Sequence, residues 1–115
     1  MNFKRQVIFH EHYFSDFYLN QTEKMQEKIE CVFKIVRTVQ KASKKFLDHI
    51  TGTNGLRKIR IEFESNIYRL FCSFDKRHLV VLFNGFQKKS QKTPKKEIDL
   101  ALKLKEEYFE SKKKI

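Results

Sequence analysis

The sequence predicts an α+β fold: a small antiparallel β-meander with the N-terminal strand added, helices packed on one face, and a C-terminal helix. The prediction rests on strand-like alternation after Arg57, on apolar residues at helical spacing in 21–40, and on a further helix after Pro94. We expect residues 1–115 to form a single domain, because 115 residues bury one modest core.

Four strands are expected. The first covers residues 3–9. In the next, after Arg57, polar and apolar residues alternate and place Ile59, Ile61 and Phe63 on one face. A turn at Ser65-Asn66 then leads to a strand over 67–74, and a turn at 75–77 leads to a more apolar strand over 78–86. An apolar strand of this kind is expected in the middle of the sheet.

The helices are predicted from caps and spacing. Asn20 with Glu23 forms a capping-box pattern before a helix over 21–40. A short helix is expected over 43–50, before the chain breaks at Thr51-Gly52-Thr53-Asn54-Gly55. Thr93 as N-cap and Pro94 at the first helical position start the last helix, which runs to about Glu110. The apolar residues expected on the inner faces of the first and last helices are Met25, Ile29, Val32, Val36, Val39, Ile98, Ala101, Leu102 and Phe109.

Charge points to the class of partner. The chain has 25 Lys and Arg against 14 Asp and Glu, a formal net charge of +11, which favours nucleic acid or an acidic protein surface. The first six residues form no apolar leader, and no run approaches the ~18 apolar residues of a membrane span, so we expect a cytoplasmic protein. Cys31 and Cys72 have no motif spacing and are expected to be buried thiols.

Alternation assigns the basic residues of the meander to one sheet face. Lys58, Arg60 and Glu62 point away from Ile59 and Ile61, and Arg69 shares its face with Phe71 and Ser73. Arg60 and Arg69 flank a hairpin turn, so their side chains are expected to be close on an open face. Two like charges held close are costly without an anion between them. The alternative is that both are solvated or paired with Glu62 or Glu64, and the pattern leaves both possibilities open.

A second basic feature is the segment 87–96, which has five lysines and no acid. It precedes a helix N-terminus, where free N–H groups attract phosphate, although a plain charged loop fits equally well. The four histidines have no partner by spacing, and there is no Gly-rich phosphate loop or metal-ligand spacing. Nuclease chemistry on this chain is therefore expected to use Arg and Lys, without a metal or another cofactor.

Ordered motifs across roughly residues 46–109 resemble a known family. The motifs are Gly55-Leu56, Ile59-Arg60-Ile61, Ile67-Tyr68-Arg69, the run Asn84-Gly85-Phe86-Gln87-Lys88-Lys89-Ser90-Gln91-Lys92-Thr93-Pro94, and Ala101. They resemble the phage-derived, HigB-like branch of the RelE/ParE toxins. The resemblance implies a RelE-like fold and a type II toxin that cuts mRNA in the ribosomal A site. It also implies a cognate antitoxin, often a HigA-like helix-turn-helix protein.

The resemblance also implies roles for individual residues. Arg60, Arg69, Lys88 and Lys89 match basic positions of the family and are expected to be catalytic. The positive charge of the chain adds Lys58, Lys92, Lys95 and Lys96 as residues expected to bind RNA. The family pattern usually has an acid before Arg60, where this chain has Lys58. Two alternatives remain: a ParE-like toxin that poisons gyrase by protein interaction, and an RNA-binding module without catalysis.

Overall fold

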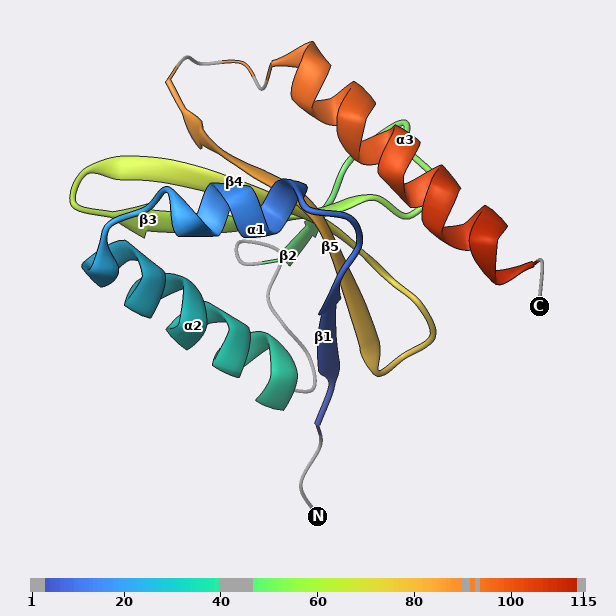
Figure 1. Cartoon of the computed structure of the whole chain (residues 1–115), viewed down its shortest axis with the longest axis horizontal. Coiled ribbons are helices and arrows are strands. Elements are labelled where there is room, and N and C mark those ends of the chain that lie inside the picture. Colours follow the sequence, from blue (N-terminus) through green and yellow to red (C-terminus); the bar gives the residue numbers. More distant parts are fainter. Residues whose placement is uncertain (1–3, 40–46, 90–91, 93, 114–115) are drawn as a thin grey trace.

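The computed structural model describes residues 4–39, 47–89, 92 and 94–113. Figure 1 shows the arrangement of the helices and strands. In chain order the elements are β1 (Gln6–Phe9), α1 (Tyr13–Leu19), α2 (Glu23–Thr38), β2 (Leu47–His49), β3 (Arg57–Phe63), β4 (Asn66–Phe74), β5 (Leu79–Lys88) and α3 (Lys95–Lys112).

One mixed sheet organises the fold. Its strand order is β1-β5-β4-β3-β2, with β1 parallel to β5 and the other neighbours antiparallel. The α+β prediction of a meander with an added N-terminal strand is therefore confirmed. The apolar strand predicted over 78–86 is β5, and it lies inside the sheet between β1 and β4, as expected.

Helices cover both faces of the sheet, so the expectation of an open face beside Arg69 was wrong in part. α1 and α2 pack on the face that carries Ile59 and Leu70. α3 packs on the opposite face, where it covers Phe71 with Ala101 and Leu104. In Figure 1, α1 and α2 lie together and α3 runs apart from them. Phe71 and Ser73 share the face of Arg69 and are buried.

The hairpin turn differs from the prediction by one residue. The last β3–β4 pair is Phe63 with Asn66, so the turn consists of Glu64 and Ser65 rather than Ser65 and Asn66. Both turn residues have positive φ, 50° and 66°. Positive φ at both central residues is the geometry of a type I′ turn, whose twist matches that of paired strands.

Two helix starts also differ from the prediction. Asn20 caps the C-terminal end of α1, and the N-cap of α2 is Thr22, whose hydroxyl accepts a hydrogen bond from the Met25 N–H at 3.2 Å. Pro94 is the N-cap of α3, one residue outside the predicted position, while Thr93 lies outside the described residues.

The predicted helix over 43–50 was wrong where the structure describes it. Residues 47–49 form β2, in which Leu47 pairs with Ile59 and is buried in the core. Pairing with β3 gives the backbone N–H and C=O groups of these residues hydrogen-bond partners. This tertiary interaction overrides a weak local preference for helix. Residues 43–46 lie outside the described residues.

Gly85 allows α1 to approach the sheet closely. A Cβ atom at this position would lie 2.8 Å from a Leu70 methyl carbon and 2.9 Å from the Phe17 ring. Both distances are shorter than a normal carbon–carbon contact, so a larger residue here would force Leu70 and Phe17 to move. The neighbouring Asn84 donates its side-chain N–H to the Glu97 carbonyl at 3.1 Å and ties the first turn of α3 to β5.

A buried carboxylate fixes the other end of α3. Asp75, which follows β4, accepts hydrogen bonds from the Tyr108 hydroxyl, at 2.7 Å, and from the Lys112 ammonium. The bond from Lys112 holds the pKa of Asp75 below its ordinary value, the bond from Tyr108 adds to this, and burial opposes it. The ionised form is therefore the form that the fold stabilises.

We predict that Asp75→Asn lowers the free energy of unfolding by about 1–2 kcal/mol at pH 7, because a charged acceptor is lost. Since folding lowers the pKa of Asp75, its contribution is complete above the unfolded-state pKa and disappears as the pH falls through the folded-state pKa. The difference between variant and wild type should therefore shrink below about pH 4. Urea unfolding at several pH values measures it.

Glu110→Gln is the control for this measurement. It removes an exposed pair with Lys113, whose Nζ lies 3.3 Å from the carboxylate, and should change stability by less than about 0.5 kcal/mol. Equal stability of Asp75→Asn and wild type at pH 7 would contradict the anchoring role.

Candidate nucleic-acid interface

The β3–β4–β5 register places cationic side chains together on the α3 face of the sheet. Arg60 lies directly opposite Arg69, and Arg69 lies directly opposite Phe86. Directly opposite residues in an antiparallel pair share a face, with Cβ atoms about 4.5–5.5 Å apart. By the same alternation, Lys58 and Lys88 stand on this face in the rows on either side. We call Lys58, Arg60, Arg69 and Lys88 the basic cluster.

Arg69 is the most buried member of the basic cluster, with 8% of its surface exposed. Its Nε is buried without a hydrogen-bond partner, and among the described residues no carboxylate lies within ion-pair distance of its guanidinium. Burial lowers the pKa of Arg69, the charge of Arg60 lowers it further, and Asp48 acts in the opposite direction. The fold therefore holds a charged donor in place without neutralising it.

Arg60 differs from Arg69 because it has a carboxylate partner. Its guanidinium lies 2.6 Å from the Glu62 carboxylate, two residues along β3, and the two side chains are 36% and 60% exposed. An ion pair this exposed contributes at most about 1 kcal/mol. A phosphate group can replace Glu62 as the partner of Arg60 at small cost.

The lysines of the basic cluster are affected by the same crowding. Partial burial lowers the pKa of Lys88, and the charges of Arg69, Lys58 and Arg60 lower it further, in that order. Lys58, the other lysine of the basic cluster, is half-buried on β3. Four cations on one small area repel one another, so an anion bound between them would relieve the repulsion.

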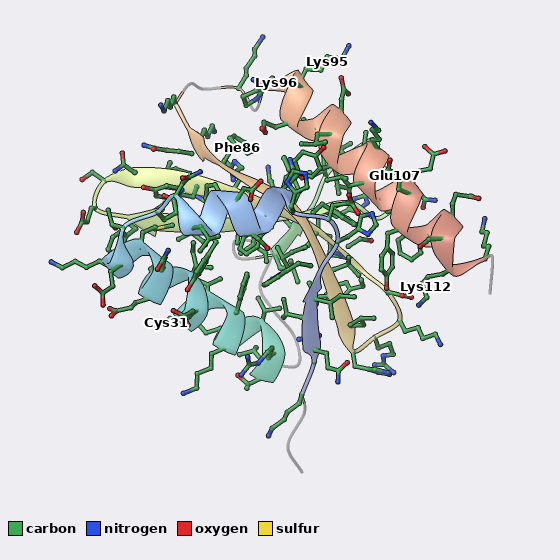
Figure 2. The ribbon with its side chains drawn as sticks, viewed as in Figure 1. Cys31, Phe86, Lys95, Lys96, Glu107 and Lys112 are labelled. Carbon is green, nitrogen blue, oxygen red and sulfur yellow. The ribbon has the colours of Figure 1, made fainter. Side chains whose placement is uncertain are left out.

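The other predicted site residues lie outside the basic cluster. Lys89 follows the last residue of β5 and is exposed, as are Lys92, Lys95 and Lys96. Figure 2 shows Lys95 and Lys96 extending from the first turn of α3, with Phe86 between that turn and the middle of the sheet. Phosphate binding by the lysine-rich segment 87–96 stays a prediction, because Ser90, Gln91 and Thr93 lie outside the described residues.

Comparison with known proteins assigns a family. Residues 16–106, more than three quarters of the chain, match the family model described as phage derived protein Gp49-like (DUF891). The chain belongs to this family. Gp49-like proteins are toxin-like proteins that occur in a toxin–antitoxin context. A search of curated proteins found no match to this chain.

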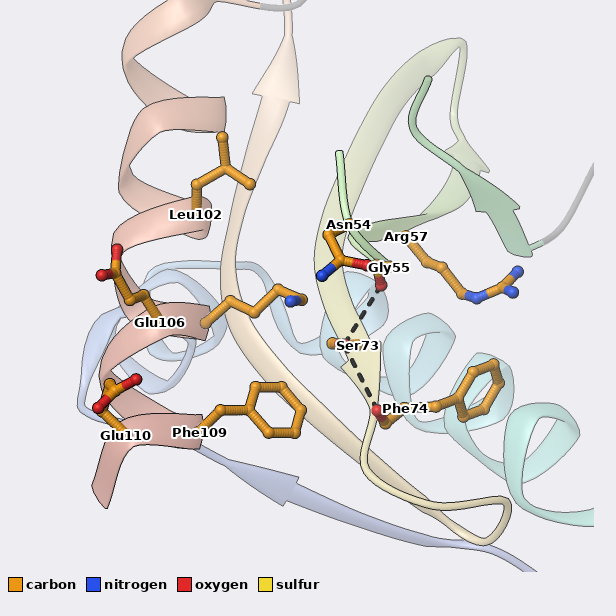
Figure 3. A pocket seen from close by; sticks show the side chains of 10 residues that line it. Asn54, Gly55, Arg57, Ser73, Phe74, Leu102, Glu106, Phe109 and Glu110 are labelled. Carbon is orange, nitrogen blue, oxygen red and sulfur yellow. Dashed lines mark hydrogen bonds between the residues drawn. The ribbon is translucent and has the colours of Figure 1, made fainter. Parts of the chain in front are cut away.

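Every member of the basic cluster lies inside the matched region of the Gp49-like protein. Figure 3 shows a second feature on the α3 face, a cleft of about 680 Å³ between α3 and the ends of β3 and β4. Leu102, Glu106 and Phe109 line one side and Ser73 the other. No member of the basic cluster lines this cleft. The charged residues of the cleft include both cations and carboxylates, so the cleft lacks the uniform positive charge that would attract RNA.

Two sequence-based statements about histidines and cysteines need correction. His12 and His10 do have carboxylate partners: His12 Nδ1 lies 2.7 Å from the Asp16 carboxylate, and His10 Nε2 lies 4.0 Å from that of Glu107. The His10 partner comes from α3, which no spacing along the chain reveals. Cys72 is buried as expected, and burial raises its pKa to about 12, but Cys31 is exposed on α2.

Across the part of the chain that the structure describes, no three His, Cys, Asp or Glu side chains gather in a way that could hold a metal ion. In the same part, no helix combines the length and the apolar character needed to cross a membrane.

We predict that Arg69→Met keeps the fold and raises the free energy of unfolding by about 0.5–2 kcal/mol. The substitution removes a buried charge with an unpaired Nε and leaves an apolar side chain of similar length beside Phe71. The comparison variant is Arg60→Met, which also removes a buried Nε without a partner and the repulsion between the arginines, but which loses the exposed pair with Glu62. Its gain in stability should therefore be smaller than that of Arg69→Met. Thermal and urea unfolding measure both variants, and a clear destabilisation by Arg69→Met would make Arg69 a structural residue.

Proposed function

We propose that this Gp49-like protein is the toxin of a type II toxin–antitoxin system, that it belongs to the HigB-like branch of the RelE/ParE superfamily, and that it cleaves mRNA on the ribosome in the cytoplasm. The observation that carries the proposal is the buried, unneutralised guanidinium of Arg69 facing Arg60 on the sheet. The family match supports the toxin assignment. The net charge of +11 favours an RNA substrate.

In the proposed reaction a ribose 2′-oxygen attacks the adjacent phosphorus, a new P–O2′ bond forms, and the bond to the 5′-oxygen of the next nucleotide breaks. Arg69 and Arg60 bind the non-bridging phosphate oxygens, on which negative charge grows in the transition state. Donors that are fixed before the reaction stabilise such charge without reorganisation. Burial fixes the Arg69 guanidinium in this way. The Arg60 guanidinium becomes available to the phosphate when its weak, exposed ion pair with Glu62 breaks.

The proton of the 2′-hydroxyl needs an acceptor, and the 5′-oxygen that leaves needs a proton. A lysine accepts a proton only when it is neutral, and a lowered pKa increases the neutral fraction near pH 7. Partial burial and the cations around Lys88 lower its pKa, which favours Lys88 over Lys89 as the acceptor of the 2′-hydroxyl proton. A water molecule or a protonated lysine beside the phosphate gives a proton to the 5′-oxygen that leaves. Lys58, Lys89, Lys92, Lys95 and Lys96 hold the RNA backbone electrostatically, and the ribosome positions the message.

If the protein binds RNA without cleaving it, the arginines are expected to stabilise the fold through salt bridges. A buried Arg60 salt bridge would favour this alternative, but the Arg60–Glu62 pair is exposed. The gyrase-poisoning alternative predicts DNA damage on expression, whereas the proposed function predicts a block of translation with mapped breaks in mRNA. Primer extension on messages after brief induction separates the two.

We predict that Arg69→Ala lowers the rate of mRNA cleavage by about 10²–10³, the usual loss when one transition-state donor is removed. Ribosome affinity should fall much less, because many other basic residues share that task. Arg69→Lys should recover only part of the rate, because it keeps the charge and loses the planar fork of donors. Single-turnover cleavage of a ribosome-bound message measures the rates.

The matched control is Arg57→Ala. Arg57 is an arginine of the neighbouring strand β3 and is half-buried, but it lies opposite Cys72 on the other face of the sheet, with its guanidinium 5.2 Å from the centre of the Phe74 ring. It should leave the rate nearly unchanged. Since Arg69 is buried, circular dichroism must show that the Ala variant is folded. A folded Arg69→Ala protein that cuts at the full rate would remove Arg69 from the site.

We predict an antitoxin as the physiological partner, small and acidic or amphipathic, with a HigA-like helix-turn-helix protein favoured by the family resemblance. An acidic protein surface would compensate the excess positive charge of the toxin. Expression of the chain alone should stop growth, and co-expression of the product of the neighbouring open reading frame should restore it. A chain that is harmless alone, with no neighbour that changes this, would refute the toxin proposal.

A further inference from the structure

Phe86 has no part in the phosphate chemistry proposed above, yet it lies in the same row as the two arginines. The register pairs Arg60 with Arg69 and Arg69 with Phe86, so the row across three strands is cation, cation, aromatic ring. Phe86 also belongs to the matched region of the family. Lys88, two residues further along β5, stands on the same face.

The core holds the ring of Phe86 in place through a contact with Phe71. Its centroid lies 5.6 Å from that of Phe71, with 30° between the ring planes. Phe71 is fully buried beneath α3, whereas Phe86 is only half-buried. A ring that packs on Phe71 and is partly exposed beside cations presents a fixed apolar surface, and covering that surface is favourable.

We propose that Phe86 is the surface on which one nucleobase of a bound single-stranded RNA stacks while Arg69 holds a phosphate of the same or the next nucleotide. This inference rests on the proposed function and adds a positioning residue to it. Every base has a flat π face, so an aromatic ring stacks on any of the four, and the cations beside it take the backbone. Adjacent positions across two paired strands match this arrangement, because base and phosphate are close neighbours within a nucleotide.

Stacking holds the ribose of that nucleotide in a fixed position relative to Arg69. A fixed ribose brings its 2′-oxygen into line with the phosphorus, and alignment of this kind accelerates an intramolecular attack. The role differs from that of the arginines, because the ring acts on the base and does not contact the phosphate group.

Two fluorescently labelled RNAs of equal length and charge provide the test: an ordinary oligoribonucleotide, and a strand with the same backbone but no bases. Phe86→Leu should bind the ordinary RNA about 5- to 150-fold more weakly than wild type, the usual range for loss of one stacked base. It should bind the abasic strand as well as wild type does. Arg69→Ala should weaken binding of both strands by a similar factor. Fluorescence anisotropy measures all of these affinities.

The matched control is Phe109→Leu. Phe109 is also a half-buried ring beside a cation, with Lys105 Nζ 5.1 Å from its centroid, but it lies on α3 outside the row. It should change neither affinity.

A second variant keeps the aromatic ring and guards against misfolding of Phe86→Leu. Since the chain contains no tryptophan, Phe86→Trp introduces one unique fluorophore. Its emission should be quenched by the ordinary RNA and should not change with the abasic strand. Equal quenching by both strands, or a Phe86→Leu loss that is the same for both, would overturn the stacking role while leaving RNA binding in place.

Other outcomes separate the inference from the function on which it rests. If the wild type binds neither strand, the RNA-directed function fails and the stacking role fails with it. If Phe86→Leu binds both RNAs normally and loses antitoxin binding, the ring is a protein contact. Cleavage adds a readout: Phe86→Leu should lower the single-turnover rate on ordinary message, with partial recovery by Phe86→Tyr.

Discussion

The two-residue turn at Glu64 and Ser65 sets the register on which the candidate site depends. With this turn Arg60 lies opposite Arg69, and two positive charges meet on one face. A turn one residue later, at Ser65 and Asn66, would move each pairing by two positions and place Arg69 opposite Glu62. Arg69 and Glu62 would then form an ordinary cross-strand ion pair. Positive φ at both turn residues is the local cost of the register that keeps the arginines together.

The helix on the second face gives that charge its chemical character. α3 buries Phe71 on the same face as Arg69, and only 8% of Arg69 is exposed, while Asn84 and Asp75 fix the two ends of the helix to the sheet. A charge held under partial cover, without a carboxylate in contact, interacts with an incoming phosphate more strongly than an exposed arginine does.

Several features of this site lower the stability of the protein and favour the proposed activity. Arg69 and Arg60 repel each other, and the Nε atoms of both are buried without hydrogen-bond partners. Phe86 leaves part of an aromatic ring in solvent. Each feature costs free energy in the isolated chain, and a bound strand of RNA would recover that cost through its phosphate and its base. Charges that repel one another and polar atoms without hydrogen-bond partners are typical of binding and catalytic surfaces.

The sequence by itself determined the strand pattern, the face of each β-residue and the excess of positive charge. Period-two alternation assigned Arg60 and Arg69 to one face, and the apolar composition of 78–86 predicted an interior strand; both follow from local geometry. Local patterns did not predict β2, because Leu47–His49 form a strand only through pairing with β3. The burial of Arg69 and the position of Phe86 beside Arg69 depend on the strand register and on how the helices pack against the sheet. Those are decided by packing between segments far apart in the sequence, where no spacing along the chain records the contact.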